Sequence, residues 1–447
     1  MKRILLVSND EVGPQMAGPG IRYYQFAQQL SKRFDVTLVV PTVPEQPLGE
    51  FEVLEAAAWR GRRFRSLANR FDVVVAQTLR SWTMKTLARA DVRVIYDLYD
   101  PFLIGNLAYH AEDGVSPRYR YVAFRAPTLL QEIALSTGSA FICASERQRD
   151  FWLGMLGALG RIEPDVADAD PSLRDLIDVV PFGLESEPAV AGAPGIKGVV
   201  PGIEPDDKVL LWGGGIWNWF DPLTPIRAVH ELAKRRSDVK LFFLGVRHPN
   251  PGIPAMGMTT RAVELAKELG LYEQFVFFNF GWVPYAERAN YLLDADIGIS
   301  SHLNTVETRF SFRTRLLDYF WAGLPTVATQ GDVLADLVRE RNLGRSVGFA
   351  DVGGWTAAIE ELVDDPDELA RVRRNVEMTR EEFTWPRVVE PLARLASLPG
   401  GAVRPSRNVS ATACRYLGVG LETVVRRRGL AGGARDVYRI LRRPPVP

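Results

Sequence analysis

Cysteine is nearly absent from the sequence, which contains only Cys143 and Cys414 among its 447 residues. Two widely separated thiols exclude a disulfide framework and a cysteine-rich metal site. Long apolar runs are also missing, since none reaches the roughly 18–20 residues that a membrane-spanning helix needs. The N-terminal apolar run is too short for the core of a secretory signal and predicts a strand instead. We therefore expect a cytoplasmic protein whose thiols stay reduced.

Net charge is absent as well, because 54 basic residues balance 54 acidic residues, but the charge is unevenly spread. Residues 401–447 contain ten arginines and two acidic residues, a net charge of +8, which leaves −8 on the first 400 residues. Two further segments, 59–70 and 116–127, combine arginine with aromatic residues. These segments suggest a partner with an anionic membrane surface, so that the protein would be peripheral on the inner membrane face. Solvated helix faces and a flexible tail are the alternatives, and no nucleic-acid partner is expected.

Apolar strands alternate with amphipathic helices along residues 1–400, which predicts an α/β fold with parallel sheets. Near the start, a strand leads into a turn at Gly18 and Gly20, after which apolar residues recur at helical spacing. The turn lacks the full G-x-G-x-x-G pattern, so a dinucleotide site is not indicated. Two interpretations of this turn therefore remain: a loop whose backbone contacts a phosphate, or a plain turn without a ligand. Arg22 is a candidate for contacting a phosphate or the acceptor molecule of a transfer reaction. The alternative is that Arg22 forms an ion pair on the surface.

Two acidic residues, Asp97 and Asp100, follow another apolar strand of the first half. Ligands of open α/β sheets bind outside the carboxyl ends of the strands. A carboxylate at this place is a candidate for binding acceptor hydroxyls or for acting as a base. Capping of the next helix by Asp100, directly before Pro101, is the alternative.

The second half repeats the order of strand, glycine loop and helix. The apolar run 209–212 leads into Gly213, Gly214 and Gly215, and glycine lets the backbone approach a ligand closely. Two glycine loops of this kind indicate a phosphate-containing ligand more specifically than one loop does.

A second unit of this half begins with a predicted strand over residues 295–300. A charged loop follows, and residues 315–323 predict a buried helix that Gly323 ends. The residues that give the loop its charge are Glu307, Arg309, Arg313 and Arg315. Because the loop follows the carboxyl end of a strand, it is expected to face a ligand.

The segment WAGLPTVAT, residues 321–329, resembles the donor-binding segment of GT-B glycosyltransferases, most of all of retaining family 4. That family usually has two glutamates separated by seven residues. Asp318 stands at the second position and Phe310 at the first, and Glu307, three residues upstream, is the candidate replacement. The resemblance covers roughly residues 1–400. It implies a GT-B fold, in which two doubly wound Rossmann-like domains face each other across a cleft.

The resemblance also implies roles for single residues. Asp318 would contact the ribose of the donor, and Glu307 would contact the hydroxyls of the donor sugar. The arginine and lysine that the family places after the second glycine loop are missing, so Arg313 and Arg315 are the predicted holders of the diphosphate. The remaining candidates are Trp282 and Val283 for the base, Gly18, Gly20, Arg22, Gly214, Gly215 and Arg309 for the phosphates, and Asp100 and His110 for catalysis.

The predicted domains follow from the same resemblance. They are an N-terminal acceptor-side domain over residues 1–185, a donor domain over 186–385, a helix that crosses back over 386–400, and a basic amphipathic tail over 401–447.

The predicted function is transfer of a sugar from a nucleotide-sugar donor to a glycan or lipid-linked acceptor of the cell envelope, with retention. No metal and no cofactor besides the donor are expected, because arginines and helix dipoles would carry the charge of the departing diphosphate. A relative with another reaction on a nucleotide sugar, such as an epimerase or a non-glycosidic coupling enzyme, is one alternative. A non-catalytic protein that binds nucleotide sugars is the other.

Overall fold

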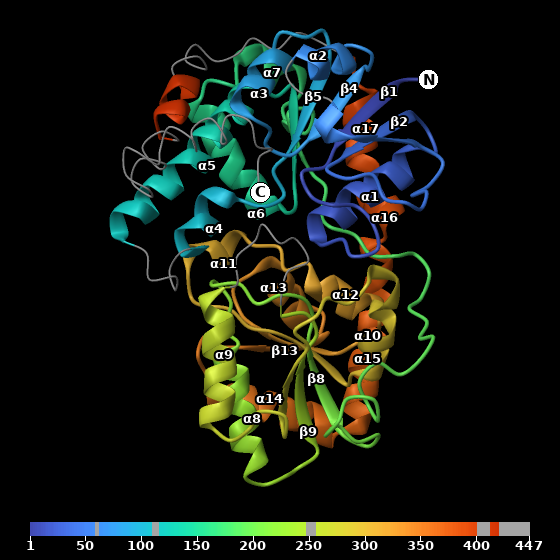
Figure 1. Ribbon diagram of the computed structural model, residues 1–447, viewed down its shortest axis with the longest axis vertical. Helices are drawn as coiled ribbons and strands as arrows, with labels where there is room; N and C mark the ends of the chain where they lie inside the picture. Colours follow the sequence, from blue (N-terminus) through green and yellow to red (C-terminus); the bar gives the residue numbers. More distant parts are fainter. Residues whose placement is uncertain (59–61, 110–115, 247–255, 400–411, 420–447) are drawn as a thin grey trace. The chain divides into compact units, whose positions relative to one another are not determined.

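The computed structural model describes residues 1–58, 62–109, 116–246, 256–399 and 412–419. The chain divides into two compact units (Figure 1). Apart from residues 111–113, which lie outside the described residues, the first unit runs to Pro181 and resumes at Val389, and the second unit is Phe182–Val388. No helix in the described part of the chain is both long and apolar enough to span a bilayer.

The first unit is built on a seven-stranded parallel sheet in the order β3-β2-β1-β4-β5-β6-β7 (Figure 1). Its central strands consist of consecutive apolar residues that are buried, as in sheets covered on both faces. The order reverses next to β1, so the sheet is doubly wound. The strands are β1 (Arg3–Val7), β2 (Asp35–Val40), β3 (Glu52–Glu55), β4 (Val73–Ala76), β5 (Arg93–Asp97), β6 (Ala140–Cys143) and β7 (Ile177–Val179).

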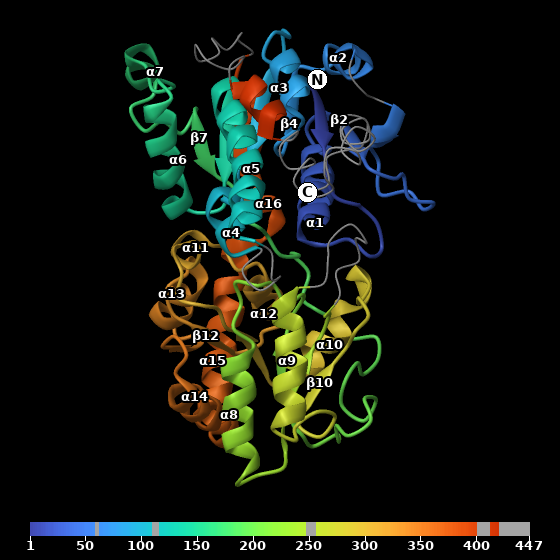
Figure 2. The ribbon, with the colours of Figure 1, turned by 60° about the vertical axis from the view of Figure 1, so that its left-hand side comes forward.

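Helices lie on both faces of this sheet (Figures 1 and 2). They include one described helix over residues 412–419, close to the C-terminus. The others are α1 (Gly18–Leu30), η1 (Ala56–Ala58), α2 (Arg62–Ala68), α3 (Ser81–Leu87), α4 (Phe102–Tyr109), α5 (Pro117–Thr137), α6 (Glu146–Ala158), α7 (Pro164–Ala169) and α17 (Glu390–Ser397).

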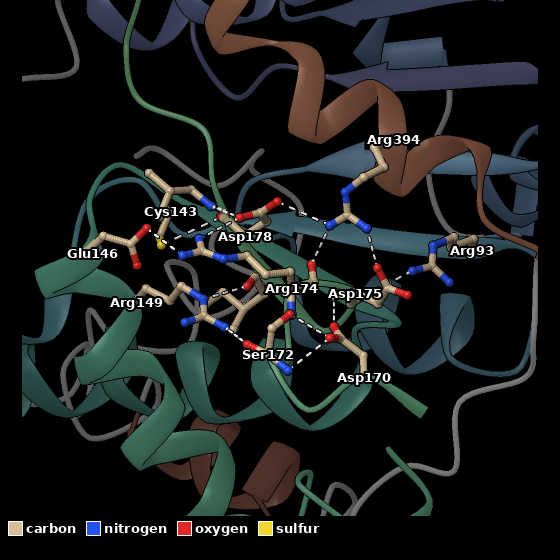
Figure 3. A network of polar contacts seen from close by, with 12 residues as sticks. Arg93, Cys143, Glu146, Arg149, Asp170, Ser172, Arg174, Asp175, Asp178 and Arg394 are labelled. Carbon is tan, nitrogen blue, oxygen red and sulfur yellow. Dashed lines mark hydrogen bonds and ion pairs between the residues drawn. The ribbon is translucent and has the colours of Figure 1, made fainter. Parts of the chain in front are cut away.

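Ion pairs and hydrogen bonds attach α17 to the first unit, although it follows the whole second unit in sequence. Arg394 contacts the carboxylates of Asp175 and, at 3.1 Å, Asp178, beside the start of β7 (Figure 3). Lys2 donates to the carbonyls at the C-terminal end of the helix, at 2.8 Å to Ser397 and 2.7 Å to Leu398. The first unit is therefore completed by a C-terminal segment, which begins at Val389 after the second unit ends.

The second unit contains a six-stranded parallel sheet in the order β10-β9-β8-β11-β12-β13 (Figure 1). All carboxyl ends lie at one edge, and the order reverses between β8 and β11. The strands are β8 (Lys208–Trp212), β9 (Val239–Phe243), β10 (Val276–Phe278), β11 (Ile297–Ser300), β12 (Thr326–Thr329) and β13 (Gly344–Val347).

Helices also cover both faces of the second sheet (Figures 1 and 2). The predicted helix from residue 315 is present as α12, and Gly323 follows it with a φ of +65°, the left-handed conformation of a glycine helix end. The helices are α8 (Leu223–Ala233), α9 (Gly257–Glu268), η2 (Tyr285–Glu287), α10 (Arg288–Asp294), α11 (Val306–Phe310), α12 (Arg315–Trp321), α13 (Val333–Glu340), α14 (Val352–Asp364), α15 (Pro366–Arg380), η3 (Glu381–Phe383) and α16 (Trp385–Val388).

Candidate functional site

The carboxyl edge of the second sheet opens between β8 and β11. These strands pair only at Leu210–Ile297 and Leu211–Gly298 and then separate. The hydroxyl of Tyr319, from α12, occupies the point of separation, 2.9 Å from the Leu211 carbonyl and 2.8 Å from the Ile299 carbonyl. It also accepts a hydrogen bond of 2.8 Å from the Gly213 amide. The hydroxyl thus accepts from the Gly213 amide and shares its single proton between the two carbonyls, so one buried side chain holds the parting strands and the start of the glycine loop in place.

The glycine loop after β8 presents its backbone to open space. Gly214 has a φ of +81°, which favours glycine, and an added Cβ would meet no atom within 4 Å. A Cβ on Gly215 would make ordinary contacts with Trp217 at 3.7 Å and with the Gly245 carbonyl at 3.8 Å, and the Gly215 carbonyl accepts a hydrogen bond of 2.9 Å from Arg315. A ligand can therefore approach the backbone closely at Gly214.

Arg315 is a cation without a carboxylate partner in the part of the chain that the structure describes. Its guanidinium carbon lies 4.6 Å from the ring centre of Trp212 and 4.2 Å from that of Phe220. Removal from water lowers the pKa of Arg315 to about 10, so the side chain is still charged at neutral pH. One of its nitrogens, Nη1, is buried and has no hydrogen-bond partner among the described residues.

Arg313 is arranged differently, because Glu307 neutralises it. The two side chains form a buried, two-pronged ion pair, with Nη1–Oε1 at 2.9 Å and Nη2–Oε2 at 2.6 Å. Glu307 and the exposed Arg309 belong to the short helix α11, where the sequence predicted only a loop. The two predicted diphosphate ligands therefore differ: one is paired within the protein and the other is not.

Orphaned polar atoms gather on the segment that these residues share. In native proteins most buried polar groups have a hydrogen-bond partner, so each exception calls for an explanation. Among the described residues, the buried side-chain atoms of residues 300–315 that have none are Ser300 Oγ, Thr305 Oγ1, Arg313 Nε and Arg315 Nη1. All four groups can donate a hydrogen bond, two of them from charged guanidinium groups, so they suit a ligand with several acceptor oxygens.

A buried histidine, His302, belongs to this segment and anchors it to a neighbouring loop. His302 Nε2 lies 2.9 Å from Asp332 Oδ2, and both side chains are buried. Burial alone would raise the pKa of Asp332, but the contact with His302 and the charge of Arg313 keep it below its usual value. Asp332 also accepts from the amides of Leu334 and Ala335 at the start of α13. The pair therefore ties the loop after β11 to the loop after β12.

Asp318, the predicted ribose contact, lies on α12 with 48% of its side chain exposed. Its partner is Arg288, whose Nε is 3.4 Å from Oδ1, a long contact that leaves the carboxylate free to accept other hydrogen bonds. Arg288 is held by stacking, 3.6 Å from the ring centre of Tyr285 and 4.2 Å from that of Trp321. Desolvation raises the pKa of Asp318 above its usual value, and the charge of Arg288 opposes that rise.

Trp282, the predicted cover of the base, lies beside the ends of two neighbouring strands. A Cβ placed on Gly245, which follows β9, would lie 3.2 Å from the Trp282 ring. A Cβ on Gly215 would in turn lie 3.8 Å from the Gly245 carbonyl. The loop after β10, which contains Trp282 and the half-buried Val283, therefore lies next to the loop after β9, and that loop lies next to the glycine loop.

The sequence analysis missed the residues that support this site. Tyr319, Arg288 and Asp332 are ordinary helix or loop residues in sequence, and their roles depend on partners up to 108 residues away. Trp217 and Trp219 stand where the family's usual cations are missing, and their rings stack at 5.1 Å with an angle of 7° between planes. Among the described residues no cluster of histidine, cysteine or acidic side chains has the make-up of a metal site.

In the first unit, the predicted turn at Gly18 and Gly20 is instead the first turn of α1. Gly20 is required there, since a Cβ would lie 2.1 Å from the Glu11 carbonyl, whereas a Cβ on Gly18 would meet nothing within 4 Å. His110 lies outside the described residues. Asp100 lies just before α4, and its carbonyl accepts from the amide of Phe102.

Arg22 is fully buried and engages several partners inside the first unit. It forms a two-pronged pair with Asp97, at 2.7 and 3.0 Å, and donates to the carbonyls of Val180 and Pro181 at 2.8 and 2.9 Å. The predicted alternative was a surface ion pair, whereas this pair is buried. Contact of Arg22 with a phosphate or an acceptor stays a prediction.

Comparison with known proteins connects this geometry to a family. Residues 207–365 match the profile of the family described as Glycosyl transferases group 1. A D-inositol 3-phosphate glycosyltransferase from Gordonia bronchialis is 23% identical over 309 residues, which make up 68% of this chain. The chain spans 60% of the length of that relative.

Solved structures match over most of the chain. WaaG, a glycosyltransferase involved in lipopolysaccharide biosynthesis, superposes with a TM-score of 0.62 at 14% identity, covering 88% of this chain and 99% of WaaG. HepE from Anabaena, in complex with UDP and glucose, gives a TM-score of 0.60 at 15% identity, covering 89% of this chain and 100% of HepE. The predicted two-domain GT-B fold is therefore confirmed, and so is the resemblance to group 1 glycosyltransferases.

Proposed function

Because the second unit matches group 1 glycosyltransferases and the chain has the GT-B fold, we propose that this protein transfers a sugar from a nucleotide-sugar donor to an acceptor. The complex of HepE with UDP-glucose makes a uridine diphosphate sugar the first donor to test. The donor binds the second unit at the carboxyl edge of its sheet, where β8 and β11 separate, since ligands of such sheets bind where the strand order reverses.

The observation that carries this proposal is the guanidinium of Arg315 next to the glycine loop, since its Nη1 has no hydrogen-bond partner among the described residues. Arg315 is half-buried and has no carboxylate partner among the described residues, and an anion that contacts its buried Nη1 would supply the missing counter-charge. The diphosphate of a nucleotide sugar brings such charge together with several acceptor oxygens. The backbone at Gly214 is open to the same ligand. Arg313 contributes its orphaned Nε, and its pairing with Glu307 holds it in place.

The proposed role of Arg315 in sugar transfer depends on the negative charge that develops on the leaving group. Negative charge grows on the leaving diphosphate in the transition state, so a fixed cation beside it lowers the barrier. Arg315 supplies this charge without a metal. Asp318 accepts from the ribose hydroxyls, and Glu307 retains acceptor capacity on both oxygens for a hydroxyl of the sugar. Retention at the anomeric carbon and an acceptor that is a glycan or lipid-linked sugar of the cell envelope complete the proposal, with Asp100 and His110 on the acceptor side.

A screen of nucleoside diphosphates and nucleotide sugars by thermal shift tests the donor site, because a ligand raises the melting temperature according to its occupancy. Incubation of the best donor with extracted envelope lipids and glycans then tests transfer, read by mass spectrometry of the product. Stabilisation by a nucleotide sugar with a glycosylated product is the expected result. Conversion of the donor sugar without any acceptor would indicate an epimerase, and binding without turnover would indicate a non-catalytic protein.

A further inference from the structure

A cation at the start of α10 holds the carboxylate that the proposed function assigns to the ribose. Arg288 is the first residue of α10, and its Nε lies 3.4 Å from Asp318 Oδ1 on α12. It is the one ion-pair partner that the described residues give Asp318. The side chain of Asp318 is 48% exposed and that of Arg288 only 14% exposed. A carboxylate that faces solvent is therefore held by a cation that is largely enclosed by protein.

Three contacts fix the position of the Arg288 guanidinium. Its central carbon lies 3.6 Å from the ring centre of Tyr285 and 4.2 Å from that of Trp321. Such stacking suits the planar, delocalised charge of arginine and does not suit the compact ammonium of lysine. In addition, Nη1 donates a hydrogen bond of 2.8 Å to the Tyr285 carbonyl. The edge that faces Asp318 is thus set before any ligand binds.

A second carboxylate, Glu185, shares the same guanidinium. Arg288 Nη2 lies 3.7 Å from Glu185 Oε1, and the Tyr285 hydroxyl donates a hydrogen bond of 2.5 Å to that oxygen. A cation placed at 3.4 and 3.7 Å from two carboxylates pairs tightly with neither of them. Asp318 is therefore oriented by Arg288 but keeps the capacity of its oxygens to accept hydrogen bonds from a ligand.

We propose that Arg288 is a positioning residue for the ribose of the nucleotide donor, and that it acts through Asp318. An exposed carboxylate that is already oriented loses less side-chain freedom when a ligand binds, so the ligand is bound more tightly. Hydrogen bonds from hydroxyls to an ionised carboxylate are stronger than bonds between neutral groups. The inference rests on the proposed function and narrows its substrate class to nucleotides whose ribose carries these hydroxyls.

Calorimetric titration with UDP and with its 2′,3′-dideoxy analogue tests this proposal, because the analogue keeps the base and the diphosphate but lacks both ribose hydroxyls. Wild type should bind UDP about ten-fold or more tightly than the analogue. Arg288→Met should lower that preference to about three-fold or less by weakening UDP binding, with the affinity for the analogue near that of wild type. Arg288→Lys keeps the charge without the stacking, so its preference should lie between the two.

A matched control and a second background separate this role from a general effect on the fold. Arg236 has a side chain that is 21% exposed, and it pairs with Asp238 and Asp364 elsewhere in the same unit. Arg236→Met should leave the preference for UDP over the analogue unchanged, whatever it does to the melting temperature. In an Asp318→Asn background, Arg288→Met should lower the preference no further, since both changes remove one contact.

The possible results distinguish this inference from the proposed function. An Arg288→Met variant that prefers UDP as strongly as wild type would overturn the inference, and so would an equal loss of affinity for both ligands. Wild type that binds both ligands equally would overturn the ribose contact and the role of Arg288, although the diphosphate site would stand. Failure of UDP to bind at all would overturn the donor site itself, and the role of Arg288 with it.

Discussion

The two arginines that the sequence presents as equivalent should behave oppositely when each is replaced by methionine. Arg315→Met removes a half-buried cation without a carboxylate partner among the described residues, together with one hydrogen bond to the Gly215 carbonyl. The lost hydrogen bond costs about 1 kcal/mol, and the relieved desolvation of the charge offsets it. The free energy of unfolding without ligand should therefore change by no more than about 1 kcal/mol.

Loss of ligand affinity is the expected consequence of Arg315→Met. A hydrogen bond between a guanidinium and a phosphate contributes about 1.5–3 kcal/mol, which corresponds to a loss of about 10- to 150-fold in the affinity for UDP. Arg313→Met leaves the buried Glu307 without its partner. Removal of one member of a buried pair costs about 3–5 kcal/mol, so this variant should unfold at much lower denaturant.

Urea unfolding without ligand and calorimetric titration of UDP separate the two effects. The reasoning is refuted if Arg315→Met binds UDP like wild type. It also fails if the two variants lose the same amount of stability, since the structure assigns only Arg313 to a buried ion pair.

Three further predictions concern single interactions. Tyr319→Phe deprives the Gly213 amide of its acceptor and removes the one proton that the two strand carbonyls share, so urea unfolding should show a loss of about 1–3 kcal/mol; unchanged stability would contradict this role. Arg22→Met should cost about 3–5 kcal/mol by leaving Asp97 buried and unpaired, and adding Asp97→Leu should restore most of that loss in the same assay; a double variant as unstable as the single one would argue against the pair. Because the pKa of Asp318 is raised, protonation on acidification should weaken UDP binding at a higher pH than for an ordinary aspartate; Asp318→Asn should bind more weakly at neutral pH and show no such dependence in calorimetry.

The fold could be predicted from the sequence to the extent that local patterns determine it. Consecutive apolar residues in the strands, such as residues 73–76, indicate a sheet covered on both faces, and Gly323 marks the end of α12. The start of α1 was misplaced, because the pattern does not distinguish a glycine turn before a helix from glycines within its first turn. The short helix α11 was missed, since five residues are too few to show a period.

The candidate residues of the site could be found from the sequence, but their pairing could not. Arg313 and Arg315 have the same chemistry and nearly the same position in sequence. Which of them meets Glu307 depends on how α11 and α12 are oriented. Arg22 and Asp97 were both candidates, yet they are 75 residues apart and only the folded first unit shows that they neutralise each other. Partner choice over such distances depends on tertiary packing, which residue type and spacing leave open.

The central claim is that Arg315 and the glycine loop hold the diphosphate of a nucleotide sugar. A crystal structure of the protein with UDP bound tests it most directly. The account predicts a phosphate oxygen at about 3 Å from Arg315 Nη1, with another oxygen facing the backbone of Gly214 and Gly215. UDP bound elsewhere, with Arg315 Nη1 remote from every phosphate oxygen, would contradict it.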